Sequence, residues 1–475
     1  MSRDGGSTPP ASSRAFCTRN RWRCENDEFR RIGVHKKKKE THRTMKIQSV
    51  KGTRDFYPPQ MAVRNFIVDG WKAASIRGGF VEYDGPIFEY LQMYQVKSGD
   101  EIVEQLFNFT DRGNRHLAIR PEITPTLARM VNKQINALPR PIKWFSVPRL
   151  CRAERPQKGR LREFFQWNID IIGVDDVLAD AEVIACSLDY LRNTGLTSND
   201  VVAKISSRRL LAALLKNIGV AENKLETLYP ILDKKAKIPV EAFCEMLAKE
   251  IDRPETIQTI LKLMDVHSVD EIPNIVTLNE EAQKSLDELI QVFTYLRKMG
   301  VEAWCRFDMS IVRGLAYYTG MVFEIHDKAG DLRAICGGGR YDNLLSDFGG
   351  PKVTATGMGM GDAVLEILLR QKGLLTDDSL DIQRLDYFVA CLDDELLDTA
   401  IEITAKLRTK GYASNFSYKT NALKKQMKVA DSMNAAKCII LGGEYKESNQ
   451  LVVKDMKTGE QELVEAATFF NADPV

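Results

Sequence analysis

The alternation of hydrophobic and polar positions divides the chain into stretches of different periodicity. Between residues 45 and about 210, helix-like and strand-like segments follow one another. The spacing predicts a helix over residues 65–78 and strands over residues 117–120, 142–147 and 164–172. Apolar and polar residues mix along the last of these strands, as in a sheet that faces a ligand. We therefore expect a ligand to bind against residues 164–172.

The pattern turns helical over about residues 209–300 and then changes twice more. Apolar residues at helical spacing predict a helical insertion there. Strands and glycine turns return over residues 304–361, and residues 372–385 read as a linker. Beyond the linker, strands alternate with helices over residues 386–475. This alternation predicts a small α/β domain with a largely parallel sheet.

Residues 1–44 lack this hydrophobic periodicity. They hold twelve Lys and Arg against five Asp and Glu, a net charge of +7. The stretch has no apolar core of a secretory signal. We expect a disordered leader, or an upstream artefact with the natural start at Met45; a basic nucleic-acid arm and an organelle transit peptide are the alternatives, although the acidic residues argue against the latter.

Composition narrows the class of protein. The 475 residues are 44% hydrophobic and 28% charged, and no long apolar run predicts a transmembrane helix. The nine cysteines form no CxxC pair and the five histidines show no metal-ligand spacing, so we expect neither a disulfide framework nor a protein-held metal. Without its first 44 residues the chain has 55 basic against 60 acidic residues, a net charge of −5. Any nucleic-acid contact must therefore come from local patches.

Cationic and aromatic residues gather in RLCRAERPQKGRLREFFQWNID, residues 149–170. Guanidinium groups fit phosphates and carboxylates and stay charged at any working pH. The cations that could cradle a polyphosphate or a nucleic-acid end are Arg149, Arg152, Arg155, Lys158, Arg160 and Arg162. In a strand, one face would carry Phe164, Gln166, Asn168 and Asp170. That face offers a ring to stack on a purine, an amide and a carboxylate; the alternative is a solvated arginine-rich hairpin.

Three further stretches carry candidate chemistry. VRGLAYYTGMVFEI (312–325) sets Arg313 before paired tyrosines, which suits anion binding or aromatic core packing. RPEIT (120–124) places a carboxylate near a hydroxyl, which suits an ammonium group or a helix start after Pro121. GMGMGD (357–362) fails the dinucleotide pattern G-x-G-x-x-G because Asp362 stands where glycine is required, and no Walker A motif exists.

Together these motifs resemble one family, the histidyl-tRNA synthetases of class II and bacterial type. The segments that carry the resemblance are KGTRDFYPP (51–59), RPEIT (120–124), RAERPQKGRLREFFQ (152–166), RGLAYYTG (313–320) and CGGGRYD (336–342). The resemblance covers about residues 48–475. It implies an α+β catalytic domain over residues 45–371, with a class II antiparallel sheet flanked by helices and a helical insertion over about 209–300. It also implies a C-terminal α/β anticodon-binding domain over residues 386–475.

The same resemblance implies an activity and its partners. The chain would join L-histidine to tRNA(His) through a histidyl-adenylate, with ATP and its Mg²⁺, as a cytoplasmic homodimer. Residues 81–89, with Pro86, would build the dimer interface, and the helical insertion would contact the tRNA acceptor arm. Both chemical steps need charge stabilisation and positioning more than a side-chain base.

Site residues follow from the same resemblance. The residues implied for histidine binding are Glu122, Thr124, Arg152, Gln166, Asp170, Arg313, Tyr317, Tyr318 and Tyr341. The residues implied for ATP binding are Arg152, Glu154, Arg160 and Phe164. Arg152 and Arg313 are the catalytic candidates, as cations at the α-phosphate. Asp170 and Tyr318 would bind the imidazole nitrogens, and Gln157 would read the extra 5′ guanosine of the tRNA.

One departure from the family pattern matters. Class II enzymes usually carry a third-motif arginine in the form G-x-x-R, and here Val364 stands at the aligned position. Two rival interpretations are a catalytically silent, histidine-sensing regulatory subunit of ATP phosphoribosyltransferase and a synthetase-like RNA-binding module. The first lacks an anticodon domain, which residues 386–475 are expected to form. The second, such as the synthetase-like region of a stress kinase, is disfavoured because the sequence has no kinase motif set.

Overall fold

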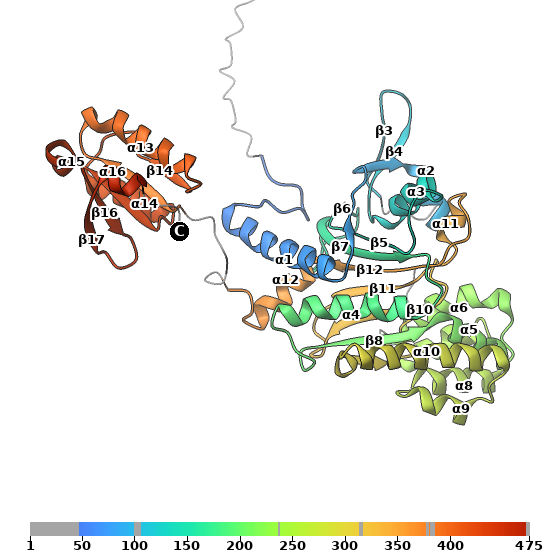
Figure 1. Cartoon of the computed structure of the whole chain (residues 1–475). Coiled ribbons are helices and arrows are strands. Elements are labelled where there is room, and N and C mark those ends of the chain that lie inside the picture. Colours follow the sequence, from blue (N-terminus) through green and yellow to red (C-terminus); the bar gives the residue numbers. More distant parts are fainter. Residues whose placement is uncertain are drawn as a thin grey trace, which may run out of the picture. The chain divides into compact units, whose positions relative to one another are not determined.

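The computed structural model describes residues 47–98, 106–235, 238–312, 317–376, 380 and 385–471. Within this part, nine strands form the main sheet, shown in Figure 1. In spatial order its strands are β1 (Val81–Glu82), β5 (Ile142–Ser146), β7 (Glu163–Ile172), β12 (Ala355–Gly361), β11 (Cys336–Arg340), β10 (Met321–Asp327), β8 (Val201–Ser207) and β9 (Cys305–Phe307), with β6 (Arg149–Cys151) paired to β7. The pairs from β5 to β8 are antiparallel. The antiparallel catalytic sheet implied by the resemblance is thus confirmed.

The long strand β7 shows the two-residue alternation that its sequence predicts. Trp167, Ile169 and Ile171 belong to the larger hydrophobic core. The intervening positions carry the polar residues Gln166, Asn168 and Asp170. Each pairs with the neighbouring strand β12, where Gly357 lies opposite Asp170. The polar face of β7 is therefore lined by glycines on the adjacent strand.

Helices α1 (Pro58–Arg77) and α4 (Leu178–Asn193) pack against the apolar face of β7. The rings of Trp71, Trp167 and Tyr190 meet there, with centroids 5.6–6.3 Å apart. The indole Nε1 of Trp167 donates to Ser75 Oγ at 2.7 Å, which satisfies its polar atom in the core. Helix α1 begins earlier than the expected residue 65, because proline fits the first helical turn.

A smaller three-stranded sheet is built from β2 (Phe88–Tyr90), β4 (His116–Ile119) and β3 (Asn108–Thr110). Helices α2 (Leu91–Ser98), α3 (Thr124–Gln134) and α11 (Leu344–Asp347) accompany it. A second hydrophobic cluster joins α3 and α11 to β5, β7 and β10. The segment that precedes α3 is therefore held close to the polar face of β7.

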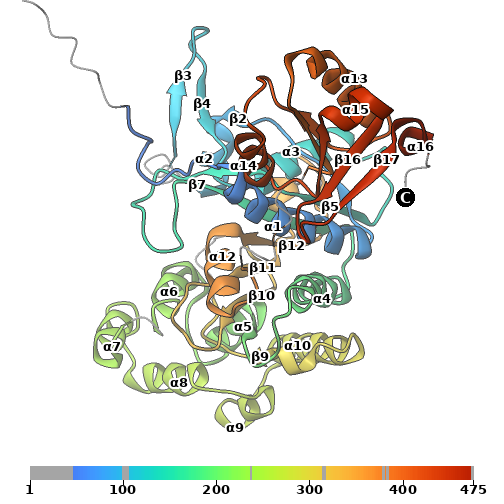
Figure 2. The same cartoon turned by 90° about the vertical axis from the view of Figure 1, so that its left-hand side faces the viewer.

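The predicted helices over about 209–300 are present. They are α5 (Arg208–Asn217), α6 (Leu225–Leu232), α7 (Val240–Ala248), α8 (Pro254–Met264), α9 (Ile272–Ile275) and α10 (Glu280–Lys298). Figures 1 and 2 show α6 to α9 as one group beside α5 and α10. The long helix α10 packs on α4 and α5, which attaches this group to the main sheet.

The C-terminal residues form their own five-stranded sheet. Its strand order is β14 (Ser414–Phe416), β13 (Tyr387–Cys391), β15 (Lys437–Leu441), β16 (Gln450–Asp455) and β17 (Gln461–Glu465). Helices α13 (Leu397–Thr409) and α14 (Leu423–Ser432) cross between the parallel strands, and the short α15 (Gly443–Ser448) and α16 (Ala466–Asn471) flank the last two strands. Because β16 and β17 run antiparallel, the sheet is mixed rather than largely parallel as expected. A tight hairpin needs no crossover helix.

Candidate active site

A cavity of about 590 Å³ opens over strands β7, β11 and β12. Predicted site residues from three separate segments line it: Glu122, Arg152, Glu154, Arg160, Phe164 and Gln166. Glu122 precedes α3, whereas Arg152, Glu154 and Arg160 come from the loop between β6 and β7, and Phe164 and Gln166 come from β7. The volume suits a nucleotide-sized ligand.

The arginines predicted for ATP lie at the wall of this cavity. Arg152 donates from Nε to the carbonyl oxygen of Pro121 at 3.1 Å, and its guanidinium carbon lies 5.1 Å from the Phe164 ring centroid. Arg160 forms an ion pair with Glu154. Burial opposes ionisation of Glu154, but the hydrogen bond and charge of Arg160 outweigh it and lower the pKa of that carboxyl. Both guanidinium groups are thereby oriented before any ligand binds.

The glycines of β12 make room for the polar side chains of β7. A methyl group at Gly357 would lie 2.1 Å from Asp170 Oδ1, and one at Gly359 would lie 2.8 Å from Gln166 Nε2. Distances below 3.0 Å are not tolerated by real Cβ atoms, so these side chains could not keep their positions. The sequence GMGMGD therefore serves the packing of the site and not a dinucleotide.

Asp170, Tyr318 and Tyr341 are buried close to one another, and the half-buried Tyr317 packs beside them. Asp170 is 3% exposed and Tyr341 is 2% exposed, and the Tyr341 hydroxyl donates to Asp170 Oδ1. Burial and the neighbouring Asp170 charge raise the pKa of Tyr341 well above its ordinary value, so Tyr341 remains a proton donor. The Tyr317 ring centroid lies 4.6 Å from that of Tyr318 and 5.9 Å from that of Tyr341. This arrangement offers a carboxylate and phenols to a polar ring.

Some predicted residues lie elsewhere. Gln157 is exposed on the turn that Gly159 closes, where it exchanges backbone hydrogen bonds with Arg160. Thr124 begins α3 and is half-buried, but it does not line the cavity. Arg313 lies outside the described residues.

Sequence reasoning missed three polar side chains of the cavity. Glu324 and His326 lie on β10 and are joined by a 2.9 Å contact between Glu324 Oε2 and His326 Nε2. Arg333 follows β10 in the turn before β11. Strand alternation could have placed Glu324 and His326 on one face, but nothing local identified that face as the polar one.

Arg54 of the motif KGTRDFYPP supports the site without lining the cavity. Arg54 donates to Asp362 Oδ2 at 2.5 Å, and Asp362 Oδ1 accepts from the backbone N–H of Phe165 at 3.1 Å. Asp362 is only 4% exposed, and burial raises the pKa of its carboxyl although the Arg54 charge opposes this. The residue that broke the dinucleotide pattern thus fixes the start of β7 beside Phe164.

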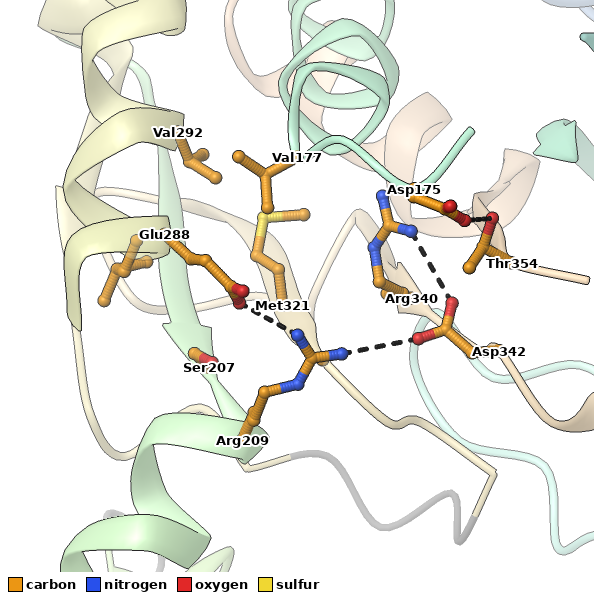
Figure 3. A pocket seen from close by; sticks show the side chains of 12 residues that line it. Asp175, Val177, Ser207, Arg209, Glu288, Val292, Met321, Arg340, Asp342 and Thr354 are labelled. Carbon is orange, nitrogen blue, oxygen red and sulfur yellow. Dashed lines mark hydrogen bonds and ion pairs between the residues drawn. The ribbon is translucent and has the colours of Figure 1, made fainter. Parts of the chain in front are cut away.

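A second cavity, of about 270 Å³, lies beside Arg340, and none of the predicted site residues lines it. Figure 3 shows Arg209 between Glu288 and Asp342, with nitrogen–oxygen distances of 2.9 and 3.5 Å. Arg340 forms a buried ion pair with Asp180 at 2.6 Å. Each of these charged side chains is paired with another, so we interpret the ion pairs around this cavity as structural.

Two searches of the described residues bear on other kinds of site. No group of three or more His, Cys, Asp or Glu residues in that part of the chain could hold a metal ion. None of the helices described there combines the length and apolar character needed to cross a membrane.

Comparisons with known proteins bear on the whole chain. The profile described as "Histidyl-tRNA synthetase" matches residues 52–362, and the one described as "Anticodon binding domain" matches residues 386–472. The chain belongs to the histidyl-tRNA synthetase family. A histidine–tRNA ligase of Arabidopsis thaliana, named chloroplastic/mitochondrial, is 40% identical over 420 residues, covering 88% of this chain and 85% of that protein. The histidine–tRNA ligase of Opitutus terrae is 36% identical, covering 87% and 94%.

The fold agrees with the family. The crystal structure of histidyl-tRNA synthetase from Nostoc sp. PCC 7120 superposes with a TM-score of 0.74 at 25% identity, covering 89% of this chain and 97% of that one. The described strands and helices therefore form the α+β architecture of a histidyl-tRNA synthetase, followed by a separate C-terminal sheet.

Proposed function

We infer that this chain attaches L-histidine to tRNA(His) in an ATP-dependent reaction. The observation that carries this inference is the cavity lined by Arg152, Arg160, Phe164 and Gln166, with Asp170 further along β7 on the same face as Gln166. Cations and a stacking ring suit ATP, while an amide and a carboxylate suit the amino group and imidazole of histidine. Family membership agrees, and no observation favours the silent regulatory alternative.

In the first step, a histidine carboxylate oxygen attacks the α-phosphorus of ATP, a new P–O bond forms, and pyrophosphate leaves with the electrons of the broken bond. Arg152 would hold both the histidine carboxylate and the α-phosphate. Its guanidinium lies between the Pro121 carbonyl and the Phe164 ring. The catalytic role of Arg313 rests on its motif alone, because it lies outside the described residues. The resulting adenylate carries an activated carbonyl.

Histidine recognition would divide between two places. Glu122 and Gln166 reach the cavity and would hold the α-amino group, with Thr124 nearby at the start of α3. Asp170 would accept from one imidazole nitrogen, and Tyr318 would contact the other. Tyr317 and Tyr341 would enclose the ring, and the Tyr341 hydroxyl orients Asp170.

In the second step, the terminal ribose hydroxyl of the tRNA attacks the adenylate carbonyl, an ester bond forms, and AMP leaves. Gln157 is exposed on the loop between β6 and β7, which supports a contact with the tRNA end. The helices α5 to α10 would contact the acceptor arm, and the sheet of residues 387–465 would bind the anticodon. The domain limits 45–371, 372–385 and 386–475 belong to this proposal.

Mg²⁺ would arrive with ATP as part of the substrate. Glu154 and Glu324 line the cavity, and carboxylate oxygens are the ligands that Mg²⁺ prefers, so the site fits the ion. When bound, Mg²⁺ would neutralise charge on the phosphate oxygens. A small number of protein ligands is normal for such an ion, which keeps several waters.

A homodimer is proposed from an exposed apolar surface, here called the motif 1 face. Its residues are Val81, Ile87, Phe88, Tyr90 and Phe109, each between 43% and 64% exposed. The ring centroids of Phe88 on β2 and Phe109 on β3 lie 6.3 Å apart. Strand β1 ends the described main sheet and so offers an edge beside this face. Such surfaces on a folded protein mark interaction sites.

A cytoplasmic location stays a prediction. The Arabidopsis relative is named chloroplastic/mitochondrial, and residues 1–46 lie outside the described part of this chain. The mass of the N-terminal peptide of the endogenous protein tests both the location and a start at Met45. A start at Met45 supports the prediction, whereas a cleaved leader contradicts it.

Charging of tRNA(His) tests the proposed function. Purified chain, ATP, Mg²⁺ and radiolabelled histidine should yield acid-precipitable histidyl-tRNA with tRNA(His) but not with tRNA(Asp). Failure of this charging by folded protein that still binds histidine would contradict the ligase and favour a histidine sensor.

A further inference from the structure

Arg333 has no place in the roles given so far, although its side chain lies in the candidate active site. We propose that Arg333 binds the β- and γ-phosphates of ATP and stabilises the departing pyrophosphate. The inference rests on the proposed function and deepens it, because it names the side chain that receives the leaving group. No motif pointed to this residue, which precedes CGGGRYD in the turn between β10 and β11.

Three guanidinium groups from two segments line the cavity. Arg152 and Arg160 come from the loop between β6 and β7, and Arg333 comes from the turn between β10 and β11. Burial and then the positive charge of Arg160 lower the pKa of Arg333, and Arg152 acts in the same direction, whereas the carboxylates of Glu154 and Glu324 oppose the shift. Like charges are costly to gather unless an anion is to lie between them. A polyphosphate is such an anion.

Arg333 is the guanidinium whose donors remain available. Arg160 is engaged by Glu154, and Arg152 is engaged by the Pro121 carbonyl and the Phe164 ring. Arg54, which lies behind the site, is paired with Asp362. Within the described part of the chain, no ion pair or hydrogen bond holds the Arg333 side chain, which is only partly covered by its neighbours. A planar fork of free donors suits two phosphate oxygens at once.

The turn that carries Arg333 is anchored. Asp327 is 5% exposed, and its carboxylate accepts from the backbone N–H groups of Asp331 at 3.2 Å and Leu332 at 3.1 Å. On the other side, the Ile335 N–H donates to the Ile325 carbonyl at 2.8 Å. The backbone on both sides of Arg333 is thus fixed, so its side chain starts from a defined point above the cavity.

The stretch where β12 ends and α12 (Asp362–Gln371) begins supplies no cation to the cavity. Val364 lines the cavity there and packs against the loop between β6 and β7, where a methyl group at Gly159 would lie 3.0 Å from Val364 Cγ2. An apolar side chain there cannot bind the ATP tail. Arg333 is therefore the further cation that the described lining of the cavity offers to the ATP tail.

The experiment compares Arg333→Ala with Lys328→Ala, which removes an exposed cation from the same turn outside the cavity. Histidine-dependent ATP–pyrophosphate exchange gives the KM values for ATP and pyrophosphate. Calorimetry gives the affinity for 5′-O-(N-histidylsulfamoyl)adenosine, a mimic of the adenylate that lacks both distal phosphates. Arg333→Ala should raise both KM values about 10- to 100-fold and leave the mimic's affinity within about twofold. Lys328→Ala should change none of these values by more than about twofold.

Two results would overturn the assignment while leaving the proposed function intact. One is an ATP KM in Arg333→Ala equal to that of Lys328→Ala. The other is an equal loss of affinity for the mimic, which would mean that Arg333 shapes the site rather than binds the distal phosphates. Val364→Arg in the Arg333→Ala background should recover part of the lost ATP affinity. If the unaltered chain shows no exchange with histidine, the proposed function fails first.

Discussion

At the scale of single residues, the polar face of β7 was predictable and its surroundings were not. Period-two alternation placed Gln166 and Asp170 on one face, and the structure confirms this. The partner of Asp170 could not be found locally, because Tyr341 is 171 positions away. Arg333 was missed for the same reason, since an arginine in a turn looks like any solvated cation until the fold brings it to the cavity.

Replacing Asp170 by Asn tests the assignment of the imidazole site. The amide can still accept from Tyr341, but the charge that would attract an imidazole N–H is lost. We expect the KM for histidine to rise about 10- to 100-fold, with the KM for ATP within about twofold. Pyrophosphate exchange at varied histidine concentrations measures this. An unaltered histidine KM would show that Asp170 does not contact the imidazole.

Arg340, beside the predicted Tyr341, has a structural role that the sequence did not reveal. Its guanidinium meets Asp180 at 2.6 Å, and the two side chains are 4% and 0% exposed. Asp180→Asn leaves the buried Arg340 charge with only the more distant Asp342 carboxylate, 3.5 Å away, so we expect a loss of about 3–5 kcal/mol of stability. Asp189→Asn is the matched control on the same helix α4, where a half-exposed pair should cost under about 1 kcal/mol. Urea denaturation of both variants measures this, and equal midpoints would refute the account.

At the scale of elements, long periodic segments were predictable and their pairing was not. The helices over 209–300 and the strand at 164–172 were correctly predicted, because their patterns are local. The order β5-β7-β12-β11-β10-β8 depends on contacts across nearly 200 residues, so only the family resemblance could supply it. The hairpin of β16 and β17 was misjudged for a related reason: a run of strands and helices does not fix the direction of the last strands.

The glycines of β12 allow this pairing to be tested. In Gly357→Ala the new methyl group would meet Asp170 Oδ1, so Asp170 must move and the histidine KM should rise at least about tenfold. Gly443→Ala in α15 is the control, because its methyl group would meet nothing within 4 Å and the residue does not line the cavity. Its histidine KM should stay within about twofold of the unaltered chain. Identical histidine KM values in the two variants would contradict the close packing of β12 on Asp170.

At the scale of the whole molecule, the chain combines the catalytic core, helical insertion and anticodon-binding domain expected of its family. Matches at residues 52–362 and 386–472 support that architecture. Composition alone gave only a globular protein without a predicted membrane span. The proposed dimer depends on the motif 1 face. Its residues Val81, Ile87 and Phe88 were expected at an interface from the resemblance and are exposed in the single chain.

Phe88→Lys tests the proposed dimer. Phe88 is 53% exposed on the motif 1 face, and a lysine there should be too costly to bury against a partner. We expect the unaltered chain to sediment as a dimer and the variant to shift toward monomer. Tyr418→Lys, which replaces an exposed aromatic residue of the C-terminal sheet region, should leave the dimer unchanged. A monomeric unaltered chain would reject the dimer outright.

The central claim is that the cavity over β7 activates histidine and no other amino acid. ATP–pyrophosphate exchange with the purified chain and each of the twenty amino acids in turn tests this most directly. Exchange with histidine alone is the predicted result, because only its ring presents two nitrogens to Asp170 and the tyrosine hydroxyls. Exchange with a different amino acid, or no exchange from folded protein that binds histidine and ATP, would contradict the account.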